Sequence, residues 1–261
     1  MVHTVPDILA RIVGSKLAAL ERVTSSERAA LERRAAARTG SRDFRAALSA
    51  NPPAIISEIK KASPSKGILT EQFDPPSIAR TYESGGAAAL SVLTDADYFQ
   101  GSLADLEAAR AAVNIPVLRK DFTVAGHHVI EAAAHGADAI LLIAAILDAG
   151  ELRRLRELAA HYKMAALVEV HNAEELDAAI ASGAEIIGVN NRNLHTFEVT
   201  LETSLRLVEK IPSDVVKVAE SGIDSRAAVQ RLQNAGFHAF LVGEHLMKSP
   251  DPAGALSELR S

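Results

Sequence analysis

The sequence predicts an α/β fold in which eight parallel strands close into a (β/α)8 barrel, with a helical extension in front of it. From residue 50 onward, short apolar runs alternate with longer amphipathic segments. Several runs are continuously apolar, which is typical of parallel strands that are covered on both faces. No G-x-G-x-x-G motif follows any run, so an open dinucleotide-binding sheet is less favoured. Eight strand–helix repeats indicate the TIM-barrel architecture.

The first 49 residues do not show this alternation of strand and helix patterns and are expected to be helical. The predicted helices are Val5–Arg22, Ser26–Arg38 and the short Asp43–Leu48. Ser26 is the expected N-cap of the second helix. The first helix has an apolar face, so the extension is expected to pack on the barrel. Residues 1–261 are therefore predicted to form a single domain, with 1–49 as its N-terminal extension.

The barrel strands are expected at the apolar runs Ala54–Lys60, Ala88–Thr94, Pro116–Lys120, Ala139–Ala145, Ala165–Val170, Glu185–Asn190, Val215–Glu220 and Phe240–Gly243. The helices between them carry readable end signals. Ser102 and Asn172 each stand three residues before an acidic residue, as in an N-terminal capping box. A glycine that fits a left-handed C-terminal cap precedes four of the strands, at Gly86, Gly136, Gly183 and Gly236.

Charged and polar side chains interrupt the strands at their C-terminal ends. Because side chains alternate along a strand, Glu58 and Lys60 point to the same side. Similar residues end the third, fifth, sixth and seventh strands, at Lys120, Glu169, Asn190 and Glu220. Barrels of this kind build their active sites at the C-terminal face. Ion pairs that only close the barrel top are the alternative explanation, but so many charges at one end favour an active site.

The loops after the last two strands predict an anion site. Ser221-Gly222 and Gly243-Glu244 each place a glycine where the backbone can approach a ligand ahead of a short helix. Only the backbone N–H of Glu244 is expected to serve a phosphate. Ser63 and Lys60 on the first loop could complete the cradle. A phosphorylated small substrate is therefore expected.

Composition excludes several other functions. The net charge of −5 and the 4% aromatic content argue against a nucleic-acid partner. With no cysteine, the chain has no disulfide framework and no thiolate metal site. The longest uncharged apolar run, Ala139–Leu147, is too short for a membrane span. We see no secretion signal and expect a cytoplasmic protein, most simply a monomer.

The nine histidines do not form a recognisable metal motif. His127 and His128 are adjacent on a predicted helix, so their rings face different directions. His161 at a helix end and His171 and His195 in loops are expected to be solvated or to cap helices. We therefore predict neither a metal nor another cofactor.

Six sequence blocks, in this order, resemble the indole-3-glycerol-phosphate synthase family. They are Ser57-Glu-Ile-Lys-Lys-Ala-Ser-Pro-Ser-Lys-Gly67, Pro116-Val-Leu-Arg-Lys-Asp-Phe122, Leu167-Val-Glu-Val-His171, Gly188-Val-Asn-Asn-Arg-Asn-Leu194, Val218-Ala-Glu-Ser-Gly-Ile223 and Leu241-Val-Gly-Glu244. The likeness covers essentially the whole chain, including the helical extension. The first block is highly specific to the family.

The resemblance implies a carboxy-lyase of tryptophan biosynthesis. Such enzymes close the indole ring of 1-(2-carboxyphenylamino)-1-deoxyribulose 5-phosphate and release CO2 and water. By this resemblance Lys120 is the general acid, Glu169 is its proton-transfer partner and Lys60 binds the benzoate carboxylate. Glu58, Asn190 and Glu220 order the catalytic network. The implied substrate-binding residues are Ser63, Pro64, Phe122, Leu141, Arg192, Leu194, Ser221, Gly222, Gly243 and Glu244.

Within that set, the resemblance implies that Ser63, Gly222 and Gly243 hold the phosphate and that Ser221 meets the substrate hydroxyls. The apolar slot for the aromatic ring is implied for Phe122, Leu141 and Leu194, with Pro64 on the flexible first loop. A lysine near a second cation in a partly desolvated mouth is expected to have a lowered pKa.

Two other functions stay open. A Schiff-base aldolase or isomerase would use Lys120 as a nucleophilic amine. A non-catalytic barrel would keep only the phosphate site.

Overall fold

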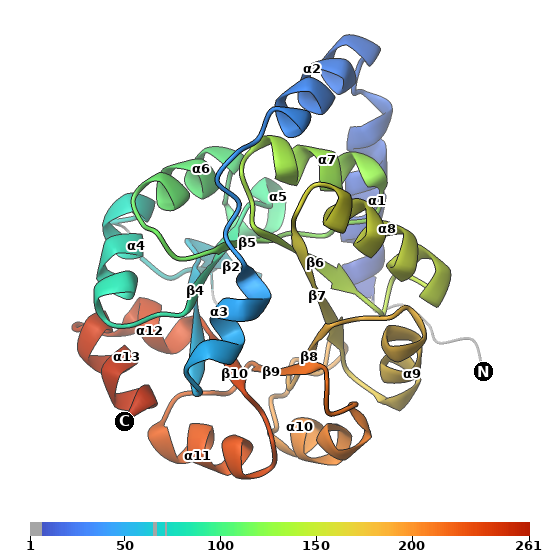
Figure 1. Cartoon of the computed structure of the whole chain (residues 1–261). Helices are drawn as coiled ribbons and strands as arrows, with labels where there is room; N and C mark the ends of the chain where they lie inside the picture. Colours follow the sequence, from blue (N-terminus) through green and yellow to red (C-terminus); the bar gives the residue numbers. More distant parts are fainter. Residues whose placement is uncertain (1–6, 65–66, 71) are drawn as a thin grey trace.

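The computed structural model describes residues 7–64, 67–70 and 72–261, and its centre is a closed barrel of eight parallel strands (Figure 1). The strands, in chain order, are β1 (Ala54–Ile59), β4 (Ala89–Leu93), β5 (Val117–Lys120), β6 (Ala139–Ile143), β7 (Ala165–Val170), β8 (Ile186–Asn190), β9 (Val216–Glu220) and β10 (Ala239–Val242). Each pairs with its neighbours in chain order, and β10 returns to β1. The predicted (β/α)8 barrel is confirmed, with strand ends that shift by two residues or fewer.

A helix or helical turn follows each barrel strand and covers the outside of the barrel. These helices are α4 (Pro75–Ser84), α5 (Ala96–Phe99), α6 (Leu103–Ala111), α7 (Gly126–Ala134), α8 (Ala149–His161), α9 (Ala173–Ala181), α10 (Glu202–Leu207), α11 (Arg226–Asn234), α12 (Glu244–Lys248) and α13 (Pro252–Arg260). A two-stranded hairpin, β2 (Ala62–Ser63) and β3 (Gly67–Ile68), follows β1 and was not expected from the sequence.

The predicted N-caps and the predicted C-terminal glycines of the barrel helices are confirmed. Ser102 accepts a hydrogen bond from the backbone N–H of Asp105, and Asn172 does the same for Glu175. The four helix-closing glycines have φ angles between 79° and 107°, which a residue with a Cβ adopts only under strain. These signals are local, so they act before any tertiary contact forms.

Alternation along the strands separates two apolar cores. One core fills the barrel interior and includes Ile56, Leu118, Leu167 and Val218. The other core lies between the barrel and its surrounding helices, where Ile55 and Val168 are completely buried. Near-complete burial of both strand faces explains why the strands read as continuous apolar runs.

The N-terminal extension reaches both ends of the barrel. Its helices are α1 (Asp7–Glu21), α2 (Ser25–Ala36) and α3 (Phe44–Ala50), and residues 1–6 lie outside the described part. Phe44 and Leu48 of α3 belong to the inner core and close the N-terminal end of the barrel. In Figure 1, α3 lies in front of the strands, α1 lies behind them, and α2 projects past the rim.

The N-cap of α2 differs from the prediction. Thr24, not Ser26, caps the helix: its hydroxyl accepts from the N–H of Glu27, and the Glu27 carboxylate accepts from the N–H of Thr24. The capping box needs an acidic side chain three residues after the cap, and only Thr24 has Glu27 at that distance.

A buried carboxylate at the bottom of the barrel holds the extension in place. Asp138, just before β6, is completely enclosed and accepts from the N–H of Arg42 at 3.0 Å. It also forms ion pairs with Arg38 at 3.5 Å and Arg110 at 3.0 Å. Among the described residues, no helix is long and apolar enough to cross a membrane.

Candidate active site

The inward-facing positions of the strands converge at the C-terminal mouth of the barrel. In β7, Ala165 and Leu167 face the inner core, and the same alternation turns Glu169 inward. A pocket of about 840 Å³ opens there. It is lined by every residue that the sequence analysis assigned to the site: Glu58, Lys60, Ser63, Pro64, Lys120, Phe122, Leu141, Glu169, Asn190, Arg192, Leu194, Glu220, Ser221, Gly222, Gly243 and Glu244.

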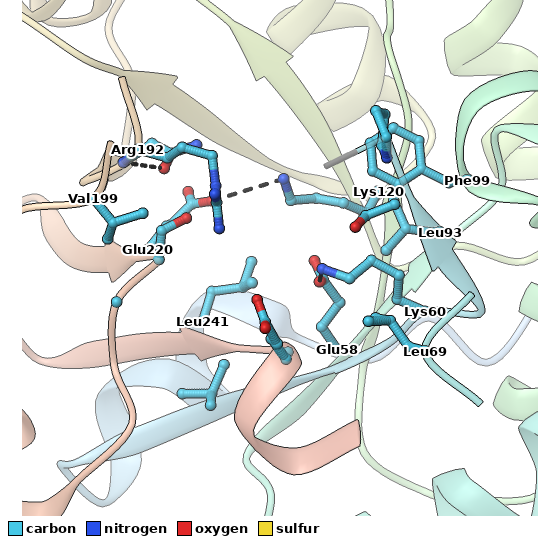
Figure 2. Close-up of a pocket in the computed structure, with 18 of the residues that line it drawn as sticks. Glu58, Lys60, Leu69, Leu93, Phe99, Lys120, Arg192, Val199, Glu220 and Leu241 are labelled. Carbon is cyan, nitrogen blue, oxygen red and sulfur yellow. Dashed lines mark hydrogen bonds and ion pairs between the residues drawn. The ribbon is translucent and has the colours of Figure 1, made fainter. Parts of the chain in front are cut away.

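Lys120 lies at the centre of the charged cluster (Figure 2). Its ammonium nitrogen is 3.3 Å from Oε2 of Glu169 and 3.8 Å from Oε2 of Glu220. Burial opposes the lysine charge, but the carboxylates of Glu169, Glu220 and Glu58 outweigh it and raise the pKa of Lys120 above its ordinary value. The expected lowering was therefore wrong: the sequence reasoning counted the neighbouring cation, whereas three carboxylates from separate strands surround the lysine.

The carboxylates around Lys120 titrate differently from one another. Burial raises the pKa of Glu169, but Lys120 and His171 outweigh burial and hold that pKa well below its usual range. Burial together with the charge of Glu169 raises the pKa of Glu220 to about 8, although Lys120 opposes the shift. The two pKa values are thus shifted in opposite directions, which favours the ionised form of Glu169 and the protonated form of Glu220.

A second lysine–carboxylate pair lies beside the first. Lys60 Nζ donates to Oε1 of Glu58 at 2.5 Å, and the Glu58 side chain is only 7% exposed. Burial raises the pKa of Glu58, but the charges of Lys60 and Lys120 outweigh burial and lower it. The two pairs give the mouth two ammonium groups that an anionic ligand could approach.

Two glycines, one inside β8 and one just after β10, make room for the buried carboxylates. A Cβ on Gly188 in β8 would overlap Oε1 of Glu220, and a Cβ on Gly243 would overlap Oε1 of Glu58. Gly243 was expected to approach a ligand, and no role was expected for Gly188. An isolated glycine inside a strand was the available signal, because it marks a close approach by another group.

The loop after β9 turns its backbone into the pocket. Ser221 and Gly222 have consecutive positive φ angles, 66° and 75°, and a Cβ on Gly222 would overlap the Val199 side chain. After β10, Gly243 precedes the short helix α12, and the carboxylate of Glu244 lies 2.6 Å from Nζ of Lys248. Its side chain therefore has a cationic partner. The helix after Gly222 begins only at Arg226, later than expected.

The apolar side of the pocket includes residues that the sequence analysis missed. The rings of Phe122 and Phe99 lie 6.2 Å apart between centroids. Ile8, Leu9 and Ile12 of α1 also line the pocket. Their apolar spacing was read as a packing face of α1; that this face covers the mouth depends on how the extension folds over the barrel.

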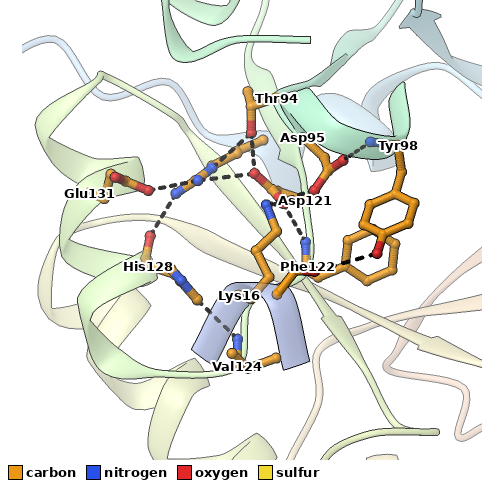
Figure 3. A network of polar contacts seen from close by, with 11 residues as sticks. Lys16, Thr94, Asp95, Tyr98, Asp121, Phe122, Val124, His128 and Glu131 are labelled. Carbon is orange, nitrogen blue, oxygen red and sulfur yellow. Dashed lines mark hydrogen bonds and ion pairs between the residues drawn. The ribbon is translucent and has the colours of Figure 1, made fainter. Parts of the chain in front are cut away.

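Behind Lys120, a buried polar network joins α1 to strand β5 (Figure 3). Lys16 of α1 lies 2.6 Å from Oδ1 of Asp121 and 2.8 Å from Oδ2 of Asp95. Asp121 also pairs with Arg119 at 3.0 Å and accepts from the Thr94 hydroxyl at 2.6 Å. The flanking charges in Arg119-Lys120-Asp121 were the available signal: Lys120 and Asp121 line the pocket, and Arg119 pairs with Asp121.

Two histidines are largely buried. His128 accepts from the N–H of Val124, and burial beside the Arg119 charge lowers the pKa of His128 to about 4. His171 was expected to be solvated or capping, but its side chain is only 11% exposed and lies 3.4 Å from Glu169. In the described part of the chain, no group of three His, Asp or Glu side chains is arranged to hold a metal ion.

Comparison with solved structures supports the fold alone. Thiamine phosphate pyrophosphorylase from Pyrococcus furiosus superposes with a TM-score of 0.61 at 18% identity, over 84% of this chain and 96% of its own. An N-acetylmannosamine-6-phosphate 2-epimerase from Clostridium perfringens gives 0.61 at 14% identity, over 80% and 93%. Both similarities are too distant in sequence to assign an activity.

Sequence comparison identifies the family. Indole-3-glycerol phosphate synthase from Albidiferax ferrireducens is 52% identical over 223 residues, 84% of each chain. The enzyme of that name from Burkholderia vietnamiensis is 49% identical over 257 residues, 97% of this chain and 98% of its own. The sequence model of indole-3-glycerol phosphate synthase matches residues 9–259, from α1 to the last helix. The chain whose barrel mouth holds these paired lysines and carboxylates therefore belongs to the indole-3-glycerol phosphate synthase family.

Proposed function

We propose that the pocket converts 1-(2-carboxyphenylamino)-1-deoxyribulose 5-phosphate into indole-3-glycerol phosphate, CO2 and water, and that Lys120 and Glu169 move the protons. The chain is thus a carboxy-lyase of tryptophan biosynthesis that acts on a small phosphorylated substrate. Family membership supports the reaction. The observation that carries the assignment of roles is the contact between Lys120 and Glu169, at 3.3 Å, inside the pocket at the barrel mouth.

The two ends of the substrate are anionic, and the pocket offers separate places for them. We assign the phosphate to Ser63 and to the backbone at Gly222 and Gly243, and the sugar hydroxyls to Ser221. Lys60 receives the benzoate carboxylate, which competes with Glu58 for the ammonium group. Arg192 and the N–H of Glu244 add positive potential at the phosphate end. Holding both ends brings the aromatic carbon close to the ketone.

Ring closure needs a proton on the ketone oxygen while the new carbon–carbon bond forms. Lys120 is charged at neutral pH and has that proton to give. The carboxylate then leaves as CO2, and the aromatic ring is restored. Loss of the hydroxyl as water needs a second proton, while a proton leaves the carbon next to the nitrogen; ionised Glu169 can accept it. Since the benzoate enters ionised, each turnover takes up one proton from solvent.

The aromatic ring of the substrate needs an apolar surface that excludes water. We assign this role to Phe122, Leu141 and Leu194, with Pro64 on the first loop above them. Leu141 lies in the inner core and is 3% exposed, so its position is set by the barrel. Asn190 and Glu220 stand at the ends of β8 and β9, where they order the charged cluster. The proposed chemistry uses neither a metal nor an organic cofactor.

The Schiff-base alternative is less compatible with the geometry. A nucleophilic lysine must lose its proton, and enzymes achieve this by lowering its pKa. The carboxylates around Lys120 raise its pKa instead. Borohydride with a ketose phosphate is expected to leave no adduct on Lys120, and a trapped adduct would favour the aldolase or isomerase.

Indole fluorescence tests the proposal, because the chain has no tryptophan and only three tyrosines. Wild-type protein and substrate should give a rise in fluorescence that scales with enzyme concentration. Lys120→Met and Glu169→Gln should each lower kcat by about 10²–10⁴-fold. Lys210→Met, at an exposed lysine, is the matched control and should retain wild-type kcat. No indole product from the wild type would refute the proposed reaction.

Three features of the whole protein belong to the same proposal. We infer a single domain, because Phe44 and Leu48 of the extension complete the inner core of the barrel. We infer a monomer without a nucleic-acid or membrane partner, in line with the modest negative charge. A cytoplasmic location fits the pathway. Sedimentation of the purified chain and cell fractionation would test the last two.

A further inference from the structure

His171 is a buried ionisable residue that the proposed reaction has not used. It lies two residues after Glu169, just beyond the end of β7, so both side chains point toward the same side of the sheet. Its Nε2 is 3.4 Å from Oε1 of Glu169. Within the part of the chain that the structure describes, this nitrogen has no hydrogen-bond partner. His171 does not line the substrate pocket.

The first turn of α9 fixes the orientation of the His171 ring. Oε2 of Glu175 lies 2.9 Å from Nδ1 of His171 and accepts from its backbone N–H at 2.8 Å. The other oxygen of Glu175 accepts from the side-chain amide of Asn172 at 2.7 Å. Asn172 in turn caps the N–H of Glu175. With Nδ1 held in this way, Nε2 stays within ion-pair distance of Glu169.

Glu169 therefore lies between two cations. Lys120 of β5 approaches Oε2, and His171 approaches Oε1. Burial disfavours the charged imidazole, but the contacts with Glu169 and Glu175 outweigh burial and raise the pKa of His171 to about 10. Glu220 of β9 has Lys120 as its ion-pair partner, at the longer distance of 3.8 Å.

Glu58 of β1 is the further charged group near this cluster, and it acts on Lys120 and Glu169 through space. It has its own cation in Lys60, which is bound at 2.5 Å. Among the neighbouring charges, that of Lys60 has the largest effect on the pKa of Glu58. The charge of His171 acts mainly on Glu169, the carboxylate that it contacts.

We propose that His171 is a positioning residue that keeps Glu169 ionised and directed at Lys120 when substrate binds. The inference deepens the proposed function and rests on it. Without the imidazolium, Glu169 loses one of its two cations, which favours its protonated form. A protonated Glu169 cannot accept the proton that the reaction releases.

The test compares kcat and KM of the wild type and His171→Gln from about pH 6 to about pH 9. Glutamine keeps a donor but removes the charge. The ratio of wild-type to variant kcat should be largest at low pH and should fall by about tenfold or more as pH rises, since a cation at this distance shifts a carboxyl pKa by about one unit or more. KM should change by less than about twofold.

Variants in α9 distinguish the contact between Glu175 and His171 from a general loss of structure. Glu175→Gln releases the ring and should produce the same pH-dependent loss to a smaller extent. Glu174→Gln removes an exposed carboxylate from the same helical turn and should leave the profile unchanged. A purely structural role would lower kcat by the same factor at every pH, and that result would overturn the proposal.

A direct measurement keeps the proposal testable even if the variants fold poorly. Side-chain ¹⁵N NMR of the wild type, with the His171 signal assigned by its loss in His171→Gln or by its shift in Glu175→Gln, should show a doubly protonated ring at about pH 8. A neutral ring there would overturn the proposal. Indole formation by the same wild-type sample distinguishes this failure from failure of the proposed reaction, because an inactive wild type would refute the reaction itself.

Discussion

Replacing Lys16 with methionine should show how strongly the N-terminal extension is attached to the catalytic strand. Methionine keeps most of the length of the side chain and removes the charge. Asp95 and Asp121 would then lose the cation that bridges them, although both side chains are only 3% exposed. Both carboxylates follow barrel strands, and Asp121 is next to Lys120 in the chain.

The contacts that survive set the size of the effect. Removing one partner of a buried ion pair costs about 3–5 kcal/mol. Asp121 keeps Arg119 and the Thr94 hydroxyl, and Asp95 keeps the N–H of Tyr98. We therefore expect a loss at or just below the low end of this range, about 2–3 kcal/mol in the free energy of unfolding. For a chain of this length, that corresponds to a fall in Tm of about 5–10 °C.

Urea unfolding of Lys16→Met, Asp95→Asn and the double variant measures the coupling between the two side chains. The double variant should lose at least about 1 kcal/mol less than the sum of the single losses, because the pair is broken only once. Arg11→Met removes an exposed charge from the same helix and serves as the control. A Lys16→Met protein within about 0.5 kcal/mol of the wild type, or additive single losses, would refute the reasoning.

Three further predictions concern single features. Gly243→Ala places a methyl group against Glu58 and should lower kcat by about tenfold or more while the protein stays folded by circular dichroism; unchanged kinetics would contradict the tight packing. Ser102→Ala removes the N-cap of α6 and should cost about 1 kcal/mol in thermal unfolding, and no loss would show that the cap is dispensable. The pKa of Asp121 in the folded protein lies below its unfolded value of 3.8. Its contribution to stability is therefore complete above pH 3.8 and is lost as the pH falls toward the folded pKa. Urea unfolding at about pH 6 and about pH 3 should show this loss of stability, and Asp121→Asn should reduce the difference between the two pH values.

Much of this protein is determined by short-range features of its sequence. The apolar runs, the caps at Ser102 and Asn172 and the left-handed glycines are properties of a few neighbouring residues, so they predict the strands and helices within a residue or two. Alternation along a strand also predicts which polar residues face the mouth. Since parallel strands of a barrel end at one face, residues as distant as Glu58 and Glu220 could be assigned to one site.

The tertiary structure decided what depends on distances between separate segments. The charge of Lys120 follows from carboxylates that three other strands bring close, so its pKa rises although the sequence suggested the opposite. The sequence places His171 in a loop, and only the turn into α9 brings its ring within 3.4 Å of Glu169. Lys16 reaches Asp121 only because the extension folds back over the mouth. Electrostatic energies fall off with distance through space, whereas a sequence gives only distance along the chain.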